Sequence, residues 1–293
     1  MPERIRRIGI VIKRQPQRAP SILRGLTRWL SKRGIEYACD RQTATVARTG
    51  GAHAGVDRAA LAAGADMILV VGGDGTLLSV ARDIGASRTP ILGVNMGSLG
   101  FLTEIPLSQL YPAIQGILEG RHTIRRRMRL TAEILRGSSV LARHEVLNEV
   151  VVNKSALARV LDIVVEVNGR FMTTFKADGL IVSTPTGSTA YSLSAGGPIV
   201  DPSLGAMILC PICPHTLTNR PVVVPDRSRV LLGLAENHGD VYVTIDGQVG
   251  SPFLPGSKVR IRKSKNPLRL IQLPGKDNFE VLRQKLKWGG HVR

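Results

Sequence analysis

The 293-residue sequence predicts an α/β N-terminal domain with a parallel sheet, followed by a mainly antiparallel all-β C-terminal domain. Three observations predict this arrangement. Short apolar runs alternate with helical patterns as far as residue 119, a two-residue hairpin signal stands at Asn168-Gly169, and short strand patterns dominate the later sequence. The sequence shows neither an internal repeat nor a low-complexity linker. We therefore expect the two domains to pack together, with the active site in the interdomain cleft.

The first part of the chain alternates predicted strands and helices. Apolar runs predict strands over residues 6–12, 35–39, 67–71 and 91–94. Apolar spacing predicts helices over residues 21–33, 56–63, 76–84 and 107–119, each followed by a glycine. Ligands of parallel sheets bind at the carboxyl ends of the strands. We therefore expect Asp74 and residues 95–100 at a binding edge.

The second part of the chain is predicted to be mainly strands. Strands over 129–135 and 140–147 flank a turn, and strands over 160–167 and 170–175 meet across Asn168-Gly169. Further strands are expected over residues 222–224, 230–234, 241–245, 258–262 and 268–273. The expected domains are 1–125 (α/β), 126–270 (β-rich) and 271–293, a C-terminal segment that returns to the first domain.

The chain is strongly basic, with 40 Lys and Arg against 22 Asp and Glu and a formal net charge of +18. Such a surface attracts polyanions, whether nucleotides or nucleic acid. Proteins that read single-stranded nucleic acid interleave aromatic and basic side chains, but aromatic residues make up only 4% here. We therefore expect anionic substrates and no specific nucleic acid, and the excess of positive charge has no assigned mechanism.

The sequence also bears on compartment and on cysteine chemistry. The N-terminal apolar run stops at Lys13, too early for a signal sequence or a membrane span, so we expect a cytoplasmic protein without a membrane partner. Cys39, Cys210 and Cys213 are too few for a disulfide framework. Cys210 and Cys213 have C-x-x-C spacing without a second pair, so reduced thiols are favoured over a zinc or redox site.

The run Gly72-Gly73-Asp74-Gly75-Thr76 directly follows the apolar strand 67–71. A glycine-rich turn between strand and helix directs backbone N–H groups and the positive end of a helix dipole at phosphate. Asp74 could act there as a base or help to hold a metal. The run is neither a P-loop nor a dinucleotide fingerprint. The alternative is an ordinary turn in which Asp74 caps the helix.

A second string, residues 178–198, crowds hydroxyl side chains into a segment that begins as a strand and breaks at Pro185 and Gly187. Taken alone, it is also typical of a polar surface loop followed by a Ser/Thr-capped helix.

Together these strings resemble the NAD kinase family, and the resemblance spans nearly the whole chain. It is carried by Gly72-Gly73-Asp74-Gly75-Thr76, residues 93–103, Asn148-Glu149, residues 178–198, residues 212–217 and Asp246-Gly247-Gln248. Six motifs in the right order are far more specific than any one of them. The family transfers the γ-phosphoryl group of ATP to the 2′-hydroxyl of the adenosine ribose of NAD, which gives NADP.

The resemblance implies a role for each matching residue. Asp74 would be the base that takes the 2′-hydroxyl proton, with Gly75 in the same turn, and Asn148 and Glu149 would hold the adenine and ribose of NAD. The other implied NAD-binding positions are Arg159, Lys176, Asp178, Thr189, Ala190, Tyr191, Ser192, Leu193, Ser194 and Gln248. Gly72, Gly73 and Thr76 are the candidates for the ATP phosphate side.

The expected cofactor is a divalent cation, Mg²⁺, which would arrive with ATP because the sequence shows no cage of carboxylates. The resemblance further implies a homo-oligomer, a dimer or tetramer. Polyphosphate in place of ATP stays open, and so does NADH, to which the identity of Lys176 is tied. Two other functions compete: diacylglycerol and sphingosine lipid kinases, which share the Gly-Gly-Asp-Gly-Thr turn, and a non-catalytic polyanion-binding protein.

Overall fold

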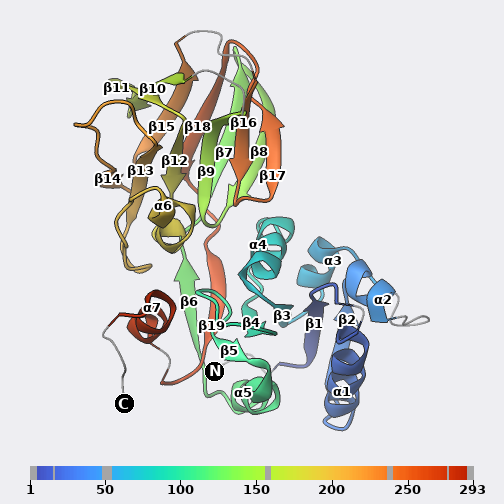
Figure 1. Ribbon diagram of the computed structural model, residues 1–293. Helices are drawn as coiled ribbons and strands as arrows, with labels where there is room; N and C mark the ends of the chain where they lie inside the picture. Colours follow the sequence, from blue (N-terminus) through green and yellow to red (C-terminus); the bar gives the residue numbers. More distant parts are fainter. Residues whose placement is uncertain are drawn as a thin grey trace. The chain divides into compact units, whose positions relative to one another are not determined.

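A computed structural model describes residues 5–15, 17–47, 55–155, 160–235, 240–275 and 277–288. The chain divides into two compact units, coloured along the sequence in Figure 1. Unit 1 comprises Met1–Arg126 and Leu268–Arg293, and unit 2 comprises Arg127–Pro267. Unit 2 is therefore inserted into the sequence of unit 1. Within the described ranges, no helix has the length and apolar character needed to cross a lipid bilayer.

Unit 1 is built on a sheet with strand order β2-β1-β3-β4-β19-β6, and β5 also pairs with β4. β1 runs parallel to β2 and β3, and β4 runs parallel to β3, β5 and β19. The strands are β1 (Arg7–Ile12), β2 (Glu36–Cys39), β3 (Met67–Gly72), β4 (Ile91–Asn95), β5 (Ile105–Pro106), β6 (Thr123–Arg127) and β19 (Leu268–Gln272). The predicted α/β unit with a parallel sheet is confirmed.

Helices cover both faces of this sheet (Figure 1). They are α1 (Ala19–Ser31), α2 (Arg41–Ala47), α3 (Arg58–Ala63), α4 (Asp74–Asp83), α5 (Leu110–Leu118) after a 3₁₀ turn at Leu107–Gln109, and α7 (Asn278–Leu286). Leu26 of α1 and Ile114 of α5 share one buried cluster with Ile8 and Ile10 of β1. Alternation along β1 turns Gly9 to the other face. There the Cβ position of Gly9 meets Leu61 of α3.

Local sequence explains where these helices begin. Pro20 stands in the first turn of α1, where a missing N–H costs nothing. α3 begins at Arg58, two residues later than the sequence predicts, because Asp57 caps it by accepting a 2.8 Å hydrogen bond from Ala60 N. Val56 instead forms a parallel bridge with Asp40. The predicted helix over 56–63 is therefore correct in type and wrong at its start.

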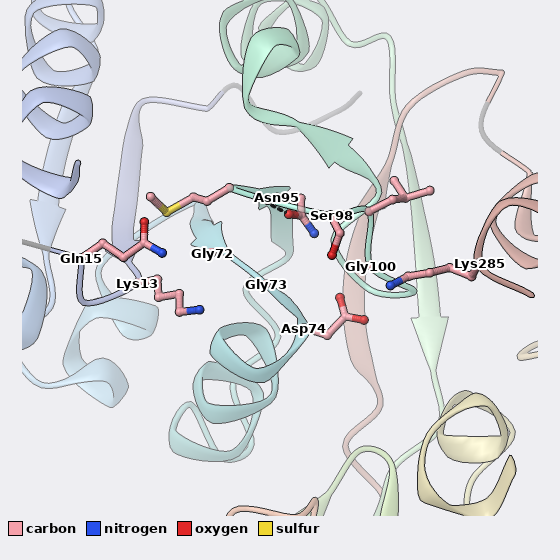
Figure 2. A pocket seen from close by; sticks show the side chains of 12 residues that line it. Lys13, Gln15, Gly72, Gly73, Asp74, Asn95, Ser98, Gly100 and Lys285 are labelled. Atoms are coloured by element: carbon pink, nitrogen blue, oxygen red, sulfur yellow. Dashed lines mark hydrogen bonds between the residues drawn. The ribbon is translucent and has the colours of Figure 1, made fainter. Parts of the chain in front are cut away.

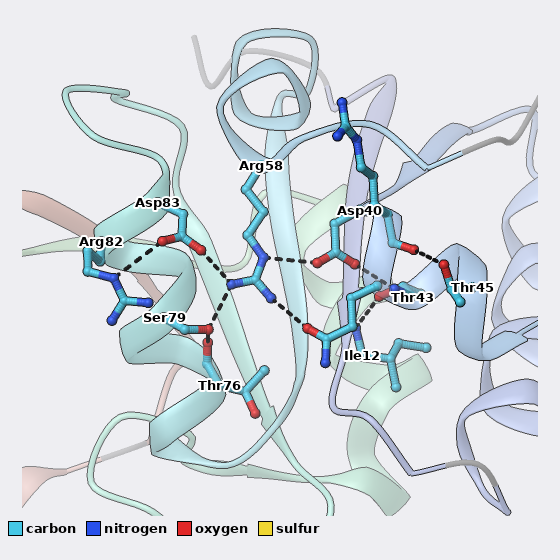
Figure 3. Close-up of polar contacts among 11 residues, drawn as sticks. Ile12, Asp40, Thr43, Thr45, Arg58, Thr76, Ser79, Arg82 and Asp83 are labelled. Atoms are coloured by element: carbon cyan, nitrogen blue, oxygen red, sulfur yellow. Dashed lines mark hydrogen bonds and ion pairs between the residues drawn. The ribbon is translucent and has the colours of Figure 1, made fainter. Parts of the chain in front are cut away.

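An ion-pair network ties α3 to its neighbours (Figure 3). The Arg58 guanidinium bonds Asp40 Oδ2 at 2.9 Å, and Asp83 Oδ2 and Ser79 Oγ at 2.8 Å each. Asp40 Oδ1 in turn accepts from Thr43 N at the start of α2. Asp40 is buried, and a buried carboxylate is costly unless it is paired and hydrogen-bonded as here. The network fixes α2, α3 and α4 in one arrangement.

Unit 2 is an antiparallel β-sandwich. In the described part of the chain its sheets have the strand orders β11-β10-β15-β18-β7-β8 and β14-β13-β12-β9-β16-β17. The strands are β7 (Leu130–Arg136), β8 (Ser139–Val146), β9 (Glu149–Lys154), β10 (Leu161–Val167), β11 (Arg170–Ala177), β12 (Gly179–Ser183), β13 (Ala206–Ile212), β14 (Val222–Pro225), β15 (Arg229–Leu234), β16 (Val241–Ile245), β17 (Val249–Pro252) and β18 (Ser257–Lys263). The predicted antiparallel unit is confirmed.

Alternate residues of these strands form the sandwich core. Ile163 of β10 and Ile261 of β18 pack in one buried cluster with Val150 of β9 and Val182 of β12. The residues between them on β9 and β12, Val151 and Ile181, face outward. They are buried with Ile208 and Cys210, and Ala195 and Val200 pack against them. The chain after β12, with a 3₁₀ turn at Thr186–Thr189 and α6 (Tyr191–Ser194), therefore covers the outer face of this sheet.

Some strands differ from the sequence prediction. The hairpin at Asn168-Gly169 is confirmed, since both residues have positive φ (54° and 76°) and Val167 pairs with Arg170. The strand predicted over 268–273 among the antiparallel strands instead joins unit 1, where Leu270 of β19 pairs with Ile91 of β4. Strands β5, β6, β9, β13 and β17 and helices α2 and α7 have no counterpart among the predicted elements.

Candidate active site

A cavity of about 330 Å³ opens in unit 1 at the carboxyl ends of β1, β3 and β4 (Figure 2). It is lined by residues 72–74 at the end of β3, residues 95–100 at the end of β4, Lys13 and Gln15 after β1, and Lys285 of α7. Parallel strands bring these ends to one edge, where the sequence places a binding site. Gly75 and Thr76 lie in the first turn of α4 and are not among the described residues that line the cavity.

The Asp74 carboxylate is held by four hydrogen bonds from the loop after β4. Oδ2 accepts from Phe101 N at 2.8 Å. Oδ1 accepts from Leu102 N at 3.1 Å, Thr103 N at 3.0 Å and Thr103 Oγ1 at 2.9 Å. Gly73, not Asp74, is the N-cap residue of α4, and Asp74 is the first residue of the helix. The interpretation of Asp74 as a helix cap is therefore wrong, because its side chain bonds a distant loop.

A second layer of contacts supports this carboxylate. Asn95 Nδ2 donates to Thr103 Oγ1 at 2.9 Å, and Asn95 Oδ1 accepts from Gly97 N at 2.6 Å. Asn95 and Thr103 are both buried. A Cβ at Gly100 would overlap Asp74 Oδ1, so only glycine allows the loop to approach this closely. The loop between β4 and β5 is thus shaped around Asp74.

In unit 2 a second carboxylate holds the turn between β8 and β9. Asp246 Oδ1 accepts from Asn148 N at 2.7 Å and Glu149 N at 3.2 Å, and Oδ2 accepts from Leu147 N at 3.1 Å. Asp246 is buried and lies at the end of β16 with a positive φ of 48°. The Asp246-Gly247-Gln248 string therefore positions the Asn148-Glu149 pair, which is distant in sequence.

Glu149 is buried, with 4% of its surface exposed. Burial, and secondarily the charge of Asp246, raises the pKa of the Glu149 carboxyl to about 8, and a hydrogen bond from the Tyr191 backbone opposes this rise. The carboxyl is therefore mostly protonated at neutral pH and can donate a hydrogen bond. Glu149 Oε2 and Asn148 Oδ1 are buried without a hydrogen-bond partner among the described residues. Such atoms are costly, so they are suited to a ligand that pairs with them.

The hydroxyl-rich segment after β12 packs against the same turn. Thr184 Oγ1 donates to Leu147 O at 2.6 Å, and Thr184 N donates to Asn148 O at 2.8 Å. A Cβ at Gly187 would overlap Asn148 O. Ser183, Thr184, Ser188 and Ser192 are fully buried. The interpretation as a polar surface loop is therefore wrong for these residues, and the hydroxyls of Ser183, Thr184 and Ser188 donate to interior backbone carbonyls.

The other predicted residues of unit 2 lie around this segment. Thr189 ends the 3₁₀ turn, Ala190 follows it, and Tyr191, Ser192, Leu193 and Ser194 form α6. The Tyr191 ring is exposed, as is the Ser194 side chain. Asp178, between β11 and β12, pairs with Lys154 Nζ at 3.0 Å, Lys176 is exposed on β11, and Gln248 is exposed in the turn after β16. Arg159 lies outside the described residues.

Sequence reasoning did not single out several residues of these two sites. Lys13 and Gln15 follow a predicted strand, so the rule about carboxyl ends could have found them. Thr103 and Asp246 stand inside strings that the sequence already marked, but their partners are 29 and 97–99 residues away. Lys285 carries no local signal, because helix α7 is absent from the predicted elements.

The structure bears on metal binding and on the cysteines in two ways. Among the described residues, no group of three or more His, Cys, Asp and Glu side chains is placed to hold a metal ion. The three cysteines are free thiols, with Cys39 and Cys210 buried and Cys213 exposed.

Comparison with known proteins matches both parts of the chain. The model of the ATP-NAD kinase N-terminal domain matches residues 8–122, and the model of the C-terminal domain matches residues 147–273. The chain is 47% identical to an NAD kinase of Geotalea daltonii and 48% identical to one of Geobacter sulfurreducens, each over 285 residues. Each match covers 97% of this chain and 99% of the relative.

Two solved structures also resemble the chain. An NAD kinase from Archaeoglobus fulgidus in complex with ATP is 26% identical with a TM-score of 0.77, covering 97% of this chain and 100% of that one. Yeast NADH kinase complexed with NADH has a TM-score of 0.88 at 22% identity, and the match covers 99% of this chain and 90% of that one. At this identity the likeness is one of fold. The two family models and the relatives near half identity show that the chain belongs to the NAD kinase family of enzymes.

Proposed function

We propose that this NAD kinase transfers the γ-phosphoryl group of ATP to the 2′-hydroxyl of the adenosine ribose of NAD, with Asp74 as the general base. The observation that carries the proposal is the Asp74 carboxylate, fixed by four hydrogen bonds at a cavity whose lining includes glycine backbone and two lysines. The similarity of the chain to the Archaeoglobus fulgidus NAD kinase in complex with ATP supports ATP as the donor.

The two oxygens of Asp74 have different tasks in this proposal. Oδ1 accepts three hydrogen bonds, whereas Oδ2 accepts one, from Phe101 N, among the described residues. Oδ2 therefore keeps a lone pair for the substrate hydroxyl. As the ribose oxygen attacks the γ-phosphorus and the bond to ADP breaks, Oδ2 takes the hydroxyl proton. The three donors to Oδ1 keep the carboxylate from rotating.

We propose that NAD is held by the predicted residues of unit 2 together with Asp74 and Gly75. Support comes from Asn148 and Glu149, whose buried side chains each present an oxygen without a partner among the described residues. The protonated Glu149 can donate to a ring nitrogen, and Asn148 Oδ1 can accept from an amino group. Adenine offers both groups on one edge. The exposed Tyr191 ring offers a stacking surface.

Phosphoryl transfer from ATP requires a divalent cation, which neutralises the charge of the triphosphate. The described residues fit a cation that is carried by the triphosphate rather than by a protein cage, because they place no group of three or more His, Cys, Asp and Glu side chains around one point. We propose Mg²⁺ for this role. Gly72 and Gly73 would face the phosphates, while the Thr76 side chain fills the space that a Cβ at Gly72 would need.

We further propose that the protein acts in the cytoplasm as a homo-oligomer, a dimer or tetramer. Exposed apolar side chains of unit 2, among them Phe171 and Tyr242, are consistent with a covered surface in an assembly. Light scattering coupled to size exclusion would measure the assembly, and a monomer at micromolar concentration would contradict it.

The decisive experiment incubates the purified chain with NAD and Mg-ATP and detects NADP with a strictly NADP-dependent dehydrogenase. NADP formation that stops in excess chelator is the expected result. Formation of phosphatidic acid from diacylglycerol without NADP would favour a lipid kinase. Salt-sensitive nucleic-acid binding without kinase activity would favour a polyanion-binding protein.

The NAD site is tested separately by Asn148→Ala and Tyr191→Ala. Both side chains should contact NAD without entering proton transfer, so KM for NAD should rise more than kcat falls. An unchanged KM with a collapsed kcat in both variants would remove these roles.

A further inference from the structure

The cavity of unit 1 holds two ammonium groups that the proposed catalytic step does not use. Lys13 lies just past β1, where its backbone N donates to Val71 O at 2.8 Å beside the glycine-rich turn. Lys285 lies in the last turn of α7. Both side chains line the cavity, and Figure 2 shows their amino groups turned toward the Gly73-Asp74 turn, one on either side in this view.

The charge of the cavity is positive. Asp74 is the one carboxylate among the described residues that line it, and that carboxylate already receives four hydrogen bonds from the loop. Neither lysine forms an ion pair with a described residue, whereas Lys154 pairs with Asp178. Two unpaired ammonium groups beside glycine backbone therefore favour a ligand with several negative charges.

Phe101 places one of these charges. Lys285 Nζ lies 5.9 Å from the centre of the Phe101 ring, at the outer limit of a cation–π contact. The backbone N of the same residue donates to Asp74 Oδ2. Phe101 therefore contacts both charged groups, the Asp74 carboxylate through its backbone and the Lys285 ammonium group through its ring. The contact also joins α7, which Asp277 caps by accepting from Phe279 N, to the loop after β4.

We infer that Lys13 and Lys285 bind the phosphate chain of the phosphoryl donor from two sides, and that the C-terminal helix α7 completes the donor site through Lys285. This inference rests on the proposed function of the same cavity. It names donor-binding residues outside the glycine-rich motif and makes donor affinity depend on the last turn of α7. The shared chemistry is a linear polyphosphate, whether part of ATP or inorganic.

The test measures binding without catalysis. Inorganic tripolyphosphate is titrated calorimetrically into the wild-type protein, Lys13→Gln, Lys285→Gln and the double variant. Each single substitution should weaken binding about tenfold, the loss expected for one charge-assisted contact, and the double variant should lose more. Lys287→Gln is the matched control, because Lys287 is exposed one residue past α7 and does not line the cavity. It should bind as the wild type does.

Kinetics then separate the donor from the acceptor. In the NADP assay, KM for Mg-ATP should rise about tenfold in Lys13→Gln and Lys285→Gln, while KM for NAD stays within about twofold. Replacing ATP by inorganic polyphosphate in a parallel assay shows which donor uses the site. Phe101→Leu, which keeps the backbone bond to Asp74, should raise KM for Mg-ATP less than Lys285→Gln does.

Two outcomes would overturn the inference: absent binding of tripolyphosphate to the wild-type protein, or equal affinity in Lys13→Gln, Lys285→Gln and Lys287→Gln. Failure of the proposed function has a different signature. Wild-type protein that binds tripolyphosphate through these lysines but makes no NADP would keep the donor site and remove the kinase reaction. Thermal unfolding of each variant checks that the exposed substitutions leave the fold intact.

Discussion

Thr103 donates its hydroxyl to Asp74 Oδ1 at 2.9 Å while it accepts from Asn95 Nδ2 at the same distance. The Thr103 hydroxyl therefore links the buried Asn95 amide to the Asp74 carboxylate at the cavity, and this chain of hydrogen bonds fixes the orientation of the carboxylate. The backbone N of Thr103 bonds the same carboxylate oxygen at 3.0 Å. Thr103 touches no reacting atom in the proposed mechanism, so it is a positioning residue.

Thr103→Val should weaken both the fold and catalysis. Valine keeps the shape of the side chain, but it leaves the buried Asn95 amide without its acceptor and removes one donor from Asp74. A buried polar group left unpaired costs about 1–3 kcal/mol. The free energy of unfolding, measured with urea, and kcat should both fall in Thr103→Val. Thr103→Ser, which keeps the hydroxyl, should restore both. A Val variant with wild-type kcat would remove the positioning role.

Asp74→Asn should lower kcat by roughly 10²–10⁴, the usual range for loss of a general base. In the variant an NH₂ group replaces one of the two accepting oxygens and faces an N–H donor of residues 101–103. The free energy of unfolding should therefore fall by about 1–3 kcal/mol. Affinity for NAD, measured by calorimetry, should change much less than turnover. Because Thr103→Val disturbs the position of Asp74 and keeps its basicity, it should retain far more activity. Near-wild-type turnover of Asp74→Asn would eliminate the catalytic role.

Alanine at two glycines of the cavity, Gly100 and Gly73, should affect stability differently. At Gly100 a Cβ would overlap Asp74 Oδ1, so Gly100→Ala should lower the melting temperature and kcat together. At Gly73 the backbone is extended with φ at −123°, and a Cβ would meet no atom within 4 Å. Gly73→Ala should therefore change stability by less than about 1 kcal/mol.

The Gly73→Ala protein should nevertheless bind Mg-ATP more weakly, because its methyl group occupies a wall of the cavity that we assign to phosphate. Measuring KM for Mg-ATP beside thermal unfolding distinguishes the two glycines. Unchanged donor affinity in a stable Gly73→Ala protein would place the phosphates elsewhere.

Glu149 should make stability depend on pH. Burial raises the pKa of its carboxyl to about 8 in the folded protein, from an ordinary value of 4.5. The folded state therefore keeps a proton that the unfolded state loses above pH 4.5, and the contribution of Glu149 to the free energy of unfolding falls as pH rises from about 4.5 to 8. Below about pH 4.5 its contribution is at its highest, and above about pH 8 it is constant.

Glu149→Gln removes this titration and keeps the shape of the side chain. Relative to the wild type, its free energy of unfolding should rise across that interval by an amount on the order of a few kcal/mol. Urea titrations near pH 5, 6.5 and 8 would measure it. Parallel pH dependence in the two proteins would mean that the carboxyl is ionised in the fold.

Elements that depend on nearby residues could be predicted from the sequence. The strand before Gly72 is a continuous apolar run, and Asn168-Gly169 supplies the positive φ that its hairpin needs. The Gly-Gly-Asp-Gly-Thr turn predicted the location of the cavity for the same reason. The start of α3 could have been predicted more closely, because Asp57 is a favoured N-cap residue.

Features that join distant segments could not be predicted in this way. The bond between Asp246 and Asn148 joins residues 98 apart in the chain, and periodicity carries no information about it. The partners of Asp74 lie 27–29 residues away, so its side chain could be mistaken for a local cap. Strand β19 has the pattern of its antiparallel neighbours, and only its pairing with β4 assigns it to unit 1.

The position of β19 between β4 and β6 has a consequence for synthesis on the ribosome. Residues 268–272 emerge after all of unit 2, so β4 and β6 can be complete for the time needed to make residues 128–267 while the strand between them is missing. During translation β4 therefore exposes the part of its edge at Ile91 that β19 later pairs, whereas β5 already pairs with β4 at Val94 and Asn95. Such an open edge is a template for wrong pairing. We expect nascent chains stalled before residue 268 to be more sensitive to protease in unit 1 than released chains, even though most of its residues have already been made.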